Sequence, residues 1–303
     1  MIFETPVTFH SHGVPLAGRF VRTTESLDRR QPAVIVVGSW LTVKEQMALT
    51  YGRELAKDGY AAFIFDFSGF GQSDGEPRQA EIPLRKIADI CAATEYLRTV
   101  SFVDPERIGC VAVCASAQYV LAALAEGAPI RSFASVAGWY HDLASVAPFY
   151  GGHAGVERRL ARAREALDTY ARTRRVLVAP AYADGDERAG MHFRLDYYAR
   201  ADRGAVPAWR NEMAEMTWFY WFTFNGLAAA GHVTTPALFV HSDGCVFPAN
   251  VRQVHATVQG PKELLWGSGA QIDFYDQPEQ MELALGAIRR WFTSTLAEQP
   301  VPV

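Results

Sequence analysis

The stretch "RIGCVAVCASAQYV", residues 107–120, places a run of apolar residues directly before a helix-forming segment. Residues 108–113 carry no charge and no large polar side chain, which is typical of a strand buried on both faces of a parallel sheet. Two nucleophilic side chains, Cys114 and Ser116, stand at the turn that follows. This stretch therefore predicts an α/β fold with a candidate site where the strand meets the helix.

The rest of the chain repeats the same alternation. Further short apolar runs occur at residues 33–37, 61–65, 132–137 and 237–241. Between several of them lie segments with apolar residues at three- and four-residue spacing, such as 45–59 and 83–100, which predict helices. Residues 7–22 instead alternate around a Gly-Val-Pro turn and predict an antiparallel hairpin. The pattern indicates a mostly parallel central sheet covered by helices on both faces.

The alternation breaks for roughly eighty residues, about 141–234. Residues 157–175 predict an Arg-rich amphipathic helix, and residues 206–226 predict a second helix with many aromatic side chains. An insertion at the carboxyl ends of the strands would cover the usual ligand site of such a sheet. We therefore expect an α/β core formed by residues 1–140 and 235–303, with a helical cap at 141–234.

The aromatic side chains of the second predicted helix bear on the substrate. Most of them are expected to pack in the core, but those that face the turn at Cys114 would make a large apolar pocket. We expect Trp209 and Tyr220 among the pocket residues. Such a pocket suits an apolar acyl or polyketide-like small molecule better than a small charged metabolite.

Composition excludes several classes of partner. The 303 residues carry a net charge of −4, which gives no electrostatic reason to expect nucleic acid or an anionic membrane surface. The sequence shows neither a leader-like start nor a membrane-spanning apolar run, which indicates a soluble cytoplasmic protein. The four cysteines show no metal-ligand spacing, so we expect reduced thiols, no metal and no cofactor.

Three motifs then connect the chain to a family. The segments "GSWLTVKEQM" at 38–47, "DFSGFGQSDGEPR" at 66–78 and "QIDFYDQP" at 271–278 resemble the dienelactone-hydrolase-like and polyketide-transferase-like branch of the α/β-hydrolase superfamily. The resemblance covers nearly the whole chain and implies an α/β-hydrolase fold with a cap. It leaves the reaction open, because this fold carries many chemistries. It also leaves room for a homodimer, which no segment of the sequence indicates.

The resemblance implies a tight turn that reads small-x-nucleophile-x-small. With Cys114 as the nucleophile the flanking residues are Ala112 and Ser116, which are both small. With Ser116 as the nucleophile one flank would be the bulky Gln118. The spacing favours Cys114 over Ser116, and the alternative is that Cys114 is an inert buried thiol. The resemblance further implies an oxyanion hole made by the backbone N–H groups of Ala115 and Trp40.

The remaining positions depart from the family pattern. Where the family has a catalytic histidine after the last strand this chain has Gln271, whose amide cannot take a proton. The acid position holds Cys245, and Asp243 serves only if its loop turns inward. His141, which follows the strand next to that of Cys114, is the best candidate for a substitute base, but the pattern favours the alternative that it is a helix-entry or loop histidine bonded to Asp142.

Three functions follow as hypotheses. The first is an acyl-handling enzyme, thioesterase-like or acyltransferase-like, in which Cys114 attacks an ester, thioester or lactone despite a degenerate triad. The second is a lyase, isomerase or cyclase that uses the same pocket without a covalent step. The third is a binding protein that has lost activity.

Overall fold

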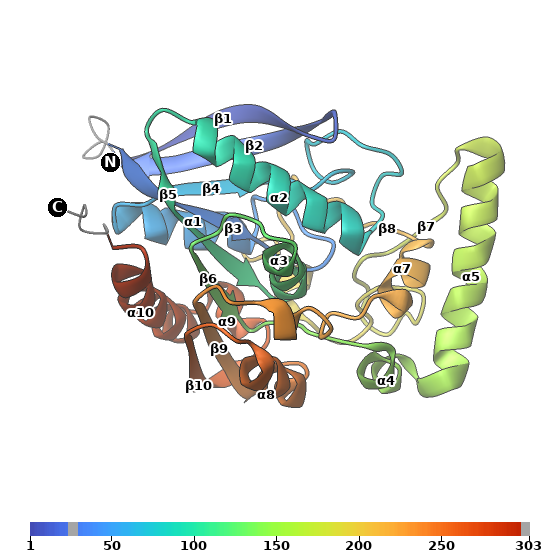
Figure 1. The fold of residues 1–303 in the computed structure, drawn as a ribbon. Helices are drawn as coiled ribbons and strands as arrows, with labels where there is room; N and C mark the ends of the chain where they lie inside the picture. The colour runs from blue at the N-terminus through green and yellow to red at the C-terminus, as the bar shows by residue number, and fades with distance from the viewer. Residues whose placement is uncertain (24–29, 298–303) are drawn as a thin grey trace.

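The computed structural model describes residues 1–23 and 30–297, and its centre is an eight-stranded sheet (Figure 1). The strand order is β1-β2-β4-β3-β5-β6-β9-β10. The strands are β1 (Ile2–Ser11), β2 (Val14–Thr23), β3 (Gln31–Val37), β4 (Ala61–Phe65), β5 (Val103–Val113), β6 (Ser132–Val136), β9 (Ala237–Gly244) and β10 (Lys262–Ala270). β1 and β2 form the antiparallel hairpin that the sequence predicts, β2 also pairs antiparallel with β4, and all other pairs are parallel.

Helices cover both faces of the sheet (Figure 1). They are α1 (Met47–Lys57), α2 (Pro83–Thr99), α3 (Ser116–Ala125), α8 (Pro248–Thr257), α9 (Asp273–Asp276) and α10 (Pro278–Thr295). Every residue of β4 and β6 is buried, as are the last six residues of β5. The continuous apolar runs of the sequence are thus the central strands, and the predicted α/β fold class is confirmed.

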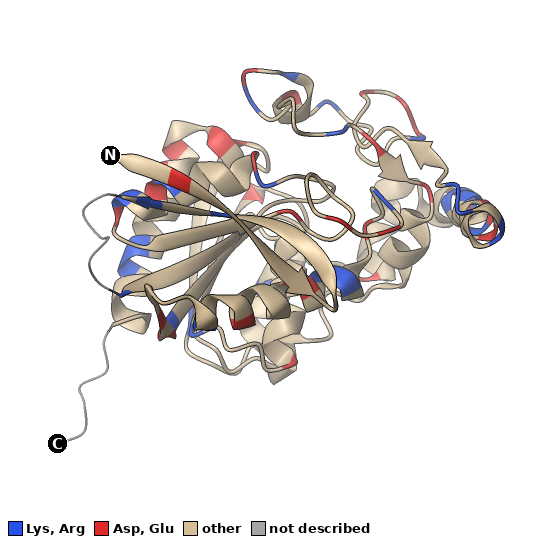
Figure 2. Cartoon of the chain, turned by 90° about the horizontal axis from the view of Figure 1, so that it is seen from above, with Lys and Arg blue, Asp and Glu red and all other residues tan. Residues whose placement is uncertain are grey.

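The chain between β6 and β9 leaves the sheet and forms mostly short elements. These are α4 (Leu143–Val146), α5 (Gly152–Thr173), β7 (Val178–Ala179), α6 (Asp196–Ala199), β8 (Met213–Ala214) and α7 (Thr217–Thr223), with single 3-10 turns at Pro148–Tyr150 and Ala230–His232. The Arg-rich helix exists as α5, and Figure 2, which views this helix end-on at the right, shows both blue and red positions on it, as a solvated face requires. We refer to residues 141–234 as the insertion.

The second helix predicted in the insertion is much shorter than expected. α7 has only 7 residues, and Met213 and Ala214, which the sequence pattern placed on the same helix, pair with Val178 and Ala179 as a two-stranded sheet. The backbone N–H of Ala214 also donates to the carbonyl of Gln79, 2.8 Å away. Backbone partners outside the segment therefore replace the helical hydrogen bonds that the aromatic periodicity suggested.

The insertion shares one continuous hydrophobic cluster with the sheet, to which it contributes Tyr150, Trp218 and Trp221. None of the helices in the described ranges has the length and apolar character needed to cross a membrane.

Candidate functional site

Cys114 is the residue at the sharp turn between β5 and α3. Its φ is 59°, a left-handed conformation that costs a non-glycine residue about 1 kcal/mol or more. Two neighbours hold the turn in place: Cys114 N–H donates to the Val136 carbonyl at 3.0 Å, and Trp139 N–H donates to the Cys114 carbonyl at 2.9 Å. A sharp turn of this kind, held by backbone hydrogen bonds, directs the side chain of its central residue away from the sheet and toward the site.

Ser116 stands one step further on, as the first residue of α3. Its side chain is fully buried and its hydroxyl has no hydrogen-bond partner in the described structure. Ser116 does not line the cavity that Cys114 lines. The geometry at the turn therefore favours Cys114 over Ser116 as the side chain that faces the cavity.

Cys114 lies at the wall of a cavity of about 290 Å³. The wall is mostly apolar and contains many aromatic side chains, which are Trp40, Trp139, Phe149, Tyr150, Phe193, Tyr198, Trp221 and Tyr275. The insertion supplies Phe149, Tyr150, Phe193, Tyr198 and Trp221, so it forms one side of the cavity while the strand ends form the other. A cavity of this size and character fits an apolar small molecule.

A small polar group lies in this apolar wall beside the thiol. The hydroxyls of Ser39 and Tyr275 are 3.4 Å apart, and Gln271 Nε2 donates to the Tyr275 hydroxyl at 3.3 Å. Sequence reasoning missed Ser39, Tyr198 and Tyr275. Ser39 and Tyr275 lie inside two of the quoted motifs, at 38–47 and 271–278. The roles predicted in those motifs went to the nearby residues Trp40 and Gln271. Tyr198 comes from the irregular part of the insertion, where no spacing signals it.

Burial raises the pKa of the Cys114 thiol. Hydrogen bonding from Ser39, Tyr275, the Ala115 N–H and Gln271 acts in the opposite direction but does not outweigh the loss of water. Cys114 is thus a neutral thiol at neutral pH, unlike the activated cysteines that sit beside a histidinium.

The two backbone donors expected for an oxyanion hole are available. Neither Trp40 N–H nor Ala115 N–H donates to a backbone carbonyl or a side-chain oxygen in the described ranges. Ala115 precedes the first turn of α3, and Trp40 sits in the loop after β3. Trp209, from the insertion, helps to fix the same loop, because its Nε1 donates to the Leu41 carbonyl at 2.8 Å.

Glu81 ties the loop after β3 to two helices. Its carboxylate is fully buried and accepts a hydrogen bond from Leu41 N–H at 3.1 Å, next to Trp40. The same carboxylate accepts from the Tyr119 hydroxyl of α3 at 2.8 Å and pairs with Lys86 of α2 at 2.7 Å. The Glu81 N–H donates to Thr217 of α7 at 3.0 Å, which extends the connection to the insertion.

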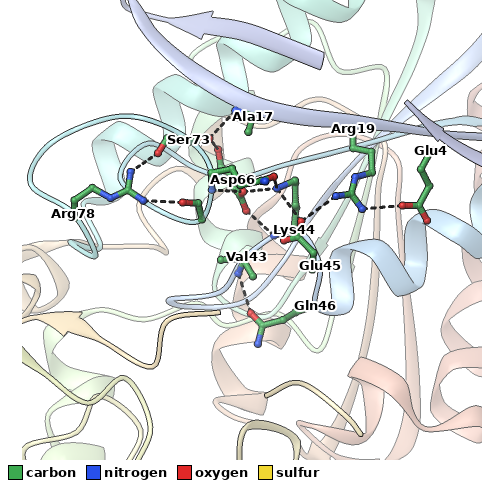
Figure 3. Close-up of polar contacts among 12 residues, drawn as sticks. Glu4, Ala17, Arg19, Val43, Lys44, Glu45, Gln46, Asp66, Ser73 and Arg78 are labelled. Carbon is green, nitrogen blue, oxygen red and sulfur yellow. Dashed lines mark hydrogen bonds and ion pairs between the residues drawn. The ribbon is translucent and has the colours of Figure 1, made fainter. Parts of the chain in front are cut away.

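A second buried ion pair, between Lys44 and Asp66, holds the later part of the loop after β3 in place (Figure 3). Lys44 Nζ lies 2.6 Å from Asp66, and the Lys44 N–H also donates to the Asp66 carboxylate at 2.8 Å. Asp66 accepts a further hydrogen bond from Gln72 N–H at 2.9 Å. Figure 3 shows Arg19 bridging Glu45 and Glu4 beside this pair. The loops after β3 and β4 are thus locked together.

Gln271 occupies the position where the family resemblance implies a histidine. Its Oε1 accepts a hydrogen bond from Val246 N–H at 3.1 Å, and its Nε2 donates to the Ala137 carbonyl at 2.7 Å. The amide thereby links the segments that follow β6, β9 and β10. It can orient a neighbour, but it cannot accept the thiol proton.

Asp243 does not reach the site. Its side chain is 75% exposed and lies 3.3 Å from Arg252 at the surface. β9 continues through Gly244, so its alternation points Ser242 inward and Asp243 outward. Cys245 is the buried side chain of this loop, with burial raising its pKa to about 11 and Ser242 Oγ 3.3 Å from its sulfur. The structure therefore corrects the expectation that Asp243 turns inward as the acid.

His141 has no ring nitrogen free for catalysis. Its Nδ1 accepts from the Trp139 indole at 2.8 Å, and its Nε2 donates to the Trp221 carbonyl at 2.9 Å. Burial lowers the pKa of His141 to about 4, so the ring is neutral at physiological pH. His141 does not line the cavity but braces two aromatic residues that do. The structure therefore does not support His141 as the base, because its only lone pair is already used.

Neither Trp209 nor Tyr220 is a pocket residue. Trp209 donates a hydrogen bond to the loop after β3. Tyr220 packs against a separate small cluster that includes Ala166, Ala214 and Met216. α7 turns its other face toward the cavity, so Trp221 takes the position expected for Tyr220.

Residues 1–23 and 30–297 contain no group of three or more His, Cys, Asp or Glu side chains placed to hold a metal ion.

Comparison with known proteins agrees with this architecture. Residues 16–169 match the model of the dienelactone hydrolase family, which is half of the chain. The chain belongs to the dienelactone hydrolase family. A crystal structure of the hypothetical protein PA2218 from Pseudomonas aeruginosa superposes with a TM-score of 0.83 over 97% of this chain and 94% of that chain, at 22% identity. At this identity the superposition establishes the fold alone.

The curated relatives match over different lengths. PA2218 is 26% identical over 287 residues, covering 91% of this chain and 76% of that protein. The uncharacterized protein YcjY of Escherichia coli is 35% identical, but over 39% of this chain and 42% of its own length. The acyltransferase drtE of Aspergillus calidoustus is 31% identical over 39% of this chain and 38% of its length. The chain thus spans less than half of YcjY and drtE in these matches.

We predict that Glu81→Gln lowers the free energy of unfolding by about 3–5 kcal/mol, because it leaves the Lys86 ammonium buried without its counter-charge. Urea denaturation measures the change. Glu95→Gln is the matched control, since Glu95 pairs with Arg98 on the exposed face of the same region and should cost about 0.5 kcal/mol or less. Equal effects of the two substitutions would contradict the structural role of Glu81.

We also predict the pH dependence of Cys114 alkylation by iodoacetamide. Because burial raises the thiol pKa above its ordinary 9.0, the thiolate fraction at pH 7 is lower than that of a free cysteine, and the rate should still be rising above pH 9. Peptide mapping separates Cys114 from half-buried Cys91. A rate that levels off below pH 8 would reveal an activating base and contradict this environment.

Proposed function

We propose that this protein is an acyl-transfer enzyme in which Cys114 accepts the acyl group of an activated thioester, ester or lactone. The observation that carries the proposal is the left-handed Cys114 at the β5–α3 turn, which lines the cavity and is accompanied by the Trp40 and Ala115 N–H groups, neither of which donates to a backbone carbonyl in the described residues. That arrangement aligns a sulfur nucleophile and an oxyanion hole on a single carbonyl group.

The proposed step balances without a separate base. The Cys114 sulfur forms a bond to the acyl carbon, and the carbonyl oxygen takes up negative charge opposite the N–H groups of Trp40 and Ala115. The bond to the leaving group then breaks, and the leaving thiol or alcohol departs with the proton that the Cys114 thiol gives up. A second nucleophile, such as an amine, alcohol or thiol, then forms a bond to the acyl carbon. The carbon–sulfur bond breaks, and the proton that the acceptor loses passes to the Cys114 sulfur, which restores the thiol.

The missing base favours activated donors and transfer over general hydrolysis. A positioned general base contributes about 10²–10⁴ in rate, and Gln271 cannot supply it. A thioester has a good leaving group, so it tolerates this loss better than an amide. Proton removal from water would suffer most, which favours an acceptor more nucleophilic than water.

The cavity favours an apolar acyl group. Its wall is mostly apolar and rich in aromatic side chains, and the insertion closes one side of it. We propose that residues 141–234 act as a cap that excludes water from the acyl group. The similarity to a protein named acyltransferase drtE agrees with this reading, although it covers only part of both chains.

The second candidate is a role without a covalent intermediate, either binding alone or lyase, isomerase or cyclase chemistry. The raised pKa of Cys114 and the bracing role of Gln271 favour it, because both reduce nucleophilic reactivity. The two candidates differ in whether an acyl adduct forms.

We predict that incubation with octanoyl-N-acetylcysteamine adds one octanoyl mass to the wild-type chain, because the thiol can displace the leaving thiol in the cavity. Intact-protein mass spectrometry measures the adduct. Cys114→Ala should abolish it, and Ser116→Ala should retain it because Ser116 does not line the cavity. An adduct that survives in Cys114→Ala, or no adduct in the wild type at pH 9, would contradict the proposal.

A further inference from the structure

The polar side chains beside the Cys114 thiol are all neutral hydrogen-bond donors. Ser39, Gln271 and Tyr275 line the cavity together with Cys114, and the side chains of all three hydrogen-bond to its sulfur. A serine hydroxyl, an amide and a protonated phenol each offer a hydrogen atom but no positive charge. Negative charge on the sulfur would therefore be stabilised by these donors and not by a neighbouring cation.

The neighbours of Gln271 fix which end of its amide faces the cluster. Its Oε1 accepts from the Val246 N–H at 3.1 Å, while its Nε2 donates to the Ala137 carbonyl at 2.7 Å and to the Tyr275 hydroxyl at 3.3 Å. A backbone N–H cannot accept a hydrogen bond and a carbonyl cannot donate one, so a flipped amide would lose both backbone bonds. Gln271 is therefore a donor to Tyr275.

The Tyr275 hydroxyl keeps one hydrogen to donate. Burial raises the pKa of Tyr275 well above its ordinary value, and the charge of Cys114 as a thiolate raises it further, so the phenol is protonated at neutral pH. Its oxygen accepts from Gln271, and its hydrogen can go to the sulfur or to the hydroxyls of Ser39 and Tyr198. Both hydroxyls carry a hydrogen of their own, whereas a thiolate carries none. The charged sulfur is therefore the preferred acceptor.

The sulfur carries negative charge at two points of the proposed reaction. The first is the attack on the acyl carbon, when the thiol gives up its proton, and the second is the departure of the sulfur when the acceptor takes the acyl group. A hydrogen bond to a charged group is stronger than one between neutral groups. A donor held against the sulfur thus favours both steps without accepting a proton.

We propose that Tyr275 is a catalytic residue of this site, with its hydroxyl donating a hydrogen bond that stabilises negative charge on the Cys114 sulfur. We further propose that Gln271 is a positioning residue, because its amide orients that hydroxyl. The inference rests on the proposed function, since it gives the donor a role in acyl transfer. Tyr275 keeps its proton in both steps, so the proton balance of the reaction is unchanged.

The pH profile of Cys114 alkylation by iodoacetamide tests this hydrogen bond without an acyl group. Tyr275→Phe removes the hydroxyl and keeps the ring, so the thiolate loses one donor and the rate at pH 8 should fall roughly tenfold. The bend at which the rate approaches its plateau should move to higher pH. A change of packing alone would alter the rate but leave the bend in place.

Two further variants separate the hydrogen bond from packing. Gln271→Met keeps the length of the side chain without its N–H groups and should slow alkylation in the same direction. The double variant should lose less than the product of the two single effects, because both act through one hydroxyl. Tyr197→Phe is the matched control, since its buried ring lies 5.1 Å from that of Tyr275 but does not line the cavity. It should keep the wild-type profile.

An unchanged profile in Tyr275→Phe, or an equal shift in Tyr197→Phe, would overturn the role of Tyr275. Fully independent effects of Gln271→Met and Tyr275→Phe would overturn the positioning role of Gln271.

The octanoyl thioester distinguishes failure of this inference from failure of the proposed function. Octanoyl-N-acetylcysteamine should acylate Tyr275→Phe roughly tenfold more slowly than the wild type at pH 7, for the same reason as in alkylation. Equal rates would leave acyl transfer standing and remove the catalytic role of Tyr275. A shifted alkylation profile without any adduct on the wild type would support the hydrogen bond to the sulfur and contradict the covalent function.

Discussion

The buried carboxylate of Glu81 is the constraint on which the site depends. It holds Leu41 N–H, the Tyr119 hydroxyl and the Lys86 ammonium at once, and so joins the loop after β3 to α3 and α2. Burying a charge is costly unless its partners satisfy it, and here three donors do so. Because α3 begins just after Cys114, the same carboxylate relates the position of Cys114, the proposed nucleophile, to that of the Trp40 N–H.

The backbone and the side chains of the site place different demands on the sequence. The strained turn at Cys114 and the positions of the Trp40 and Ala115 N–H groups depend on the course of the backbone, so they tolerate changes of side chain. A catalytic base and acid would depend on single side chains, and the positions that the family resemblance implies for them hold Gln271 and Cys245. The Gln271 amide bridges Val246 and Ala137, so it fixes the segments after β9 and β6 but cannot transfer a proton.

The fold was predictable from the sequence because its strands are buried on both faces. Runs such as Ala61–Phe65 are typical of such strands, and the small residues on either side of Cys114 pointed to it as the turn residue. Side-chain direction was not predictable at the ends of strands. Asp243 faces Arg252, and His141 is consumed by Trp139 and Trp221, through contacts between segments far apart in the sequence.

The cavity wall was the least predictable part of the site, because the insertion is held by contacts outside itself and follows no period. Tyr198 and Trp221 line the cavity while Tyr220 does not, a difference that only the packing of α6 and α7 decides. The aromatic content of the segment indicated an apolar site, but it could not tell which rings face the substrate.

The lifetime of the acyl enzyme tests the central claim most directly, namely that Cys114 holds an acyl group without a base to release it to water. Octanoyl-loaded wild type and Gln271→His can be followed side by side by intact mass at pH 7. The account predicts a long-lived wild-type adduct and hydrolysis at least about tenfold faster in the histidine variant, because an imidazole can activate water. A wild-type adduct that decays as fast as that of Gln271→His would contradict it.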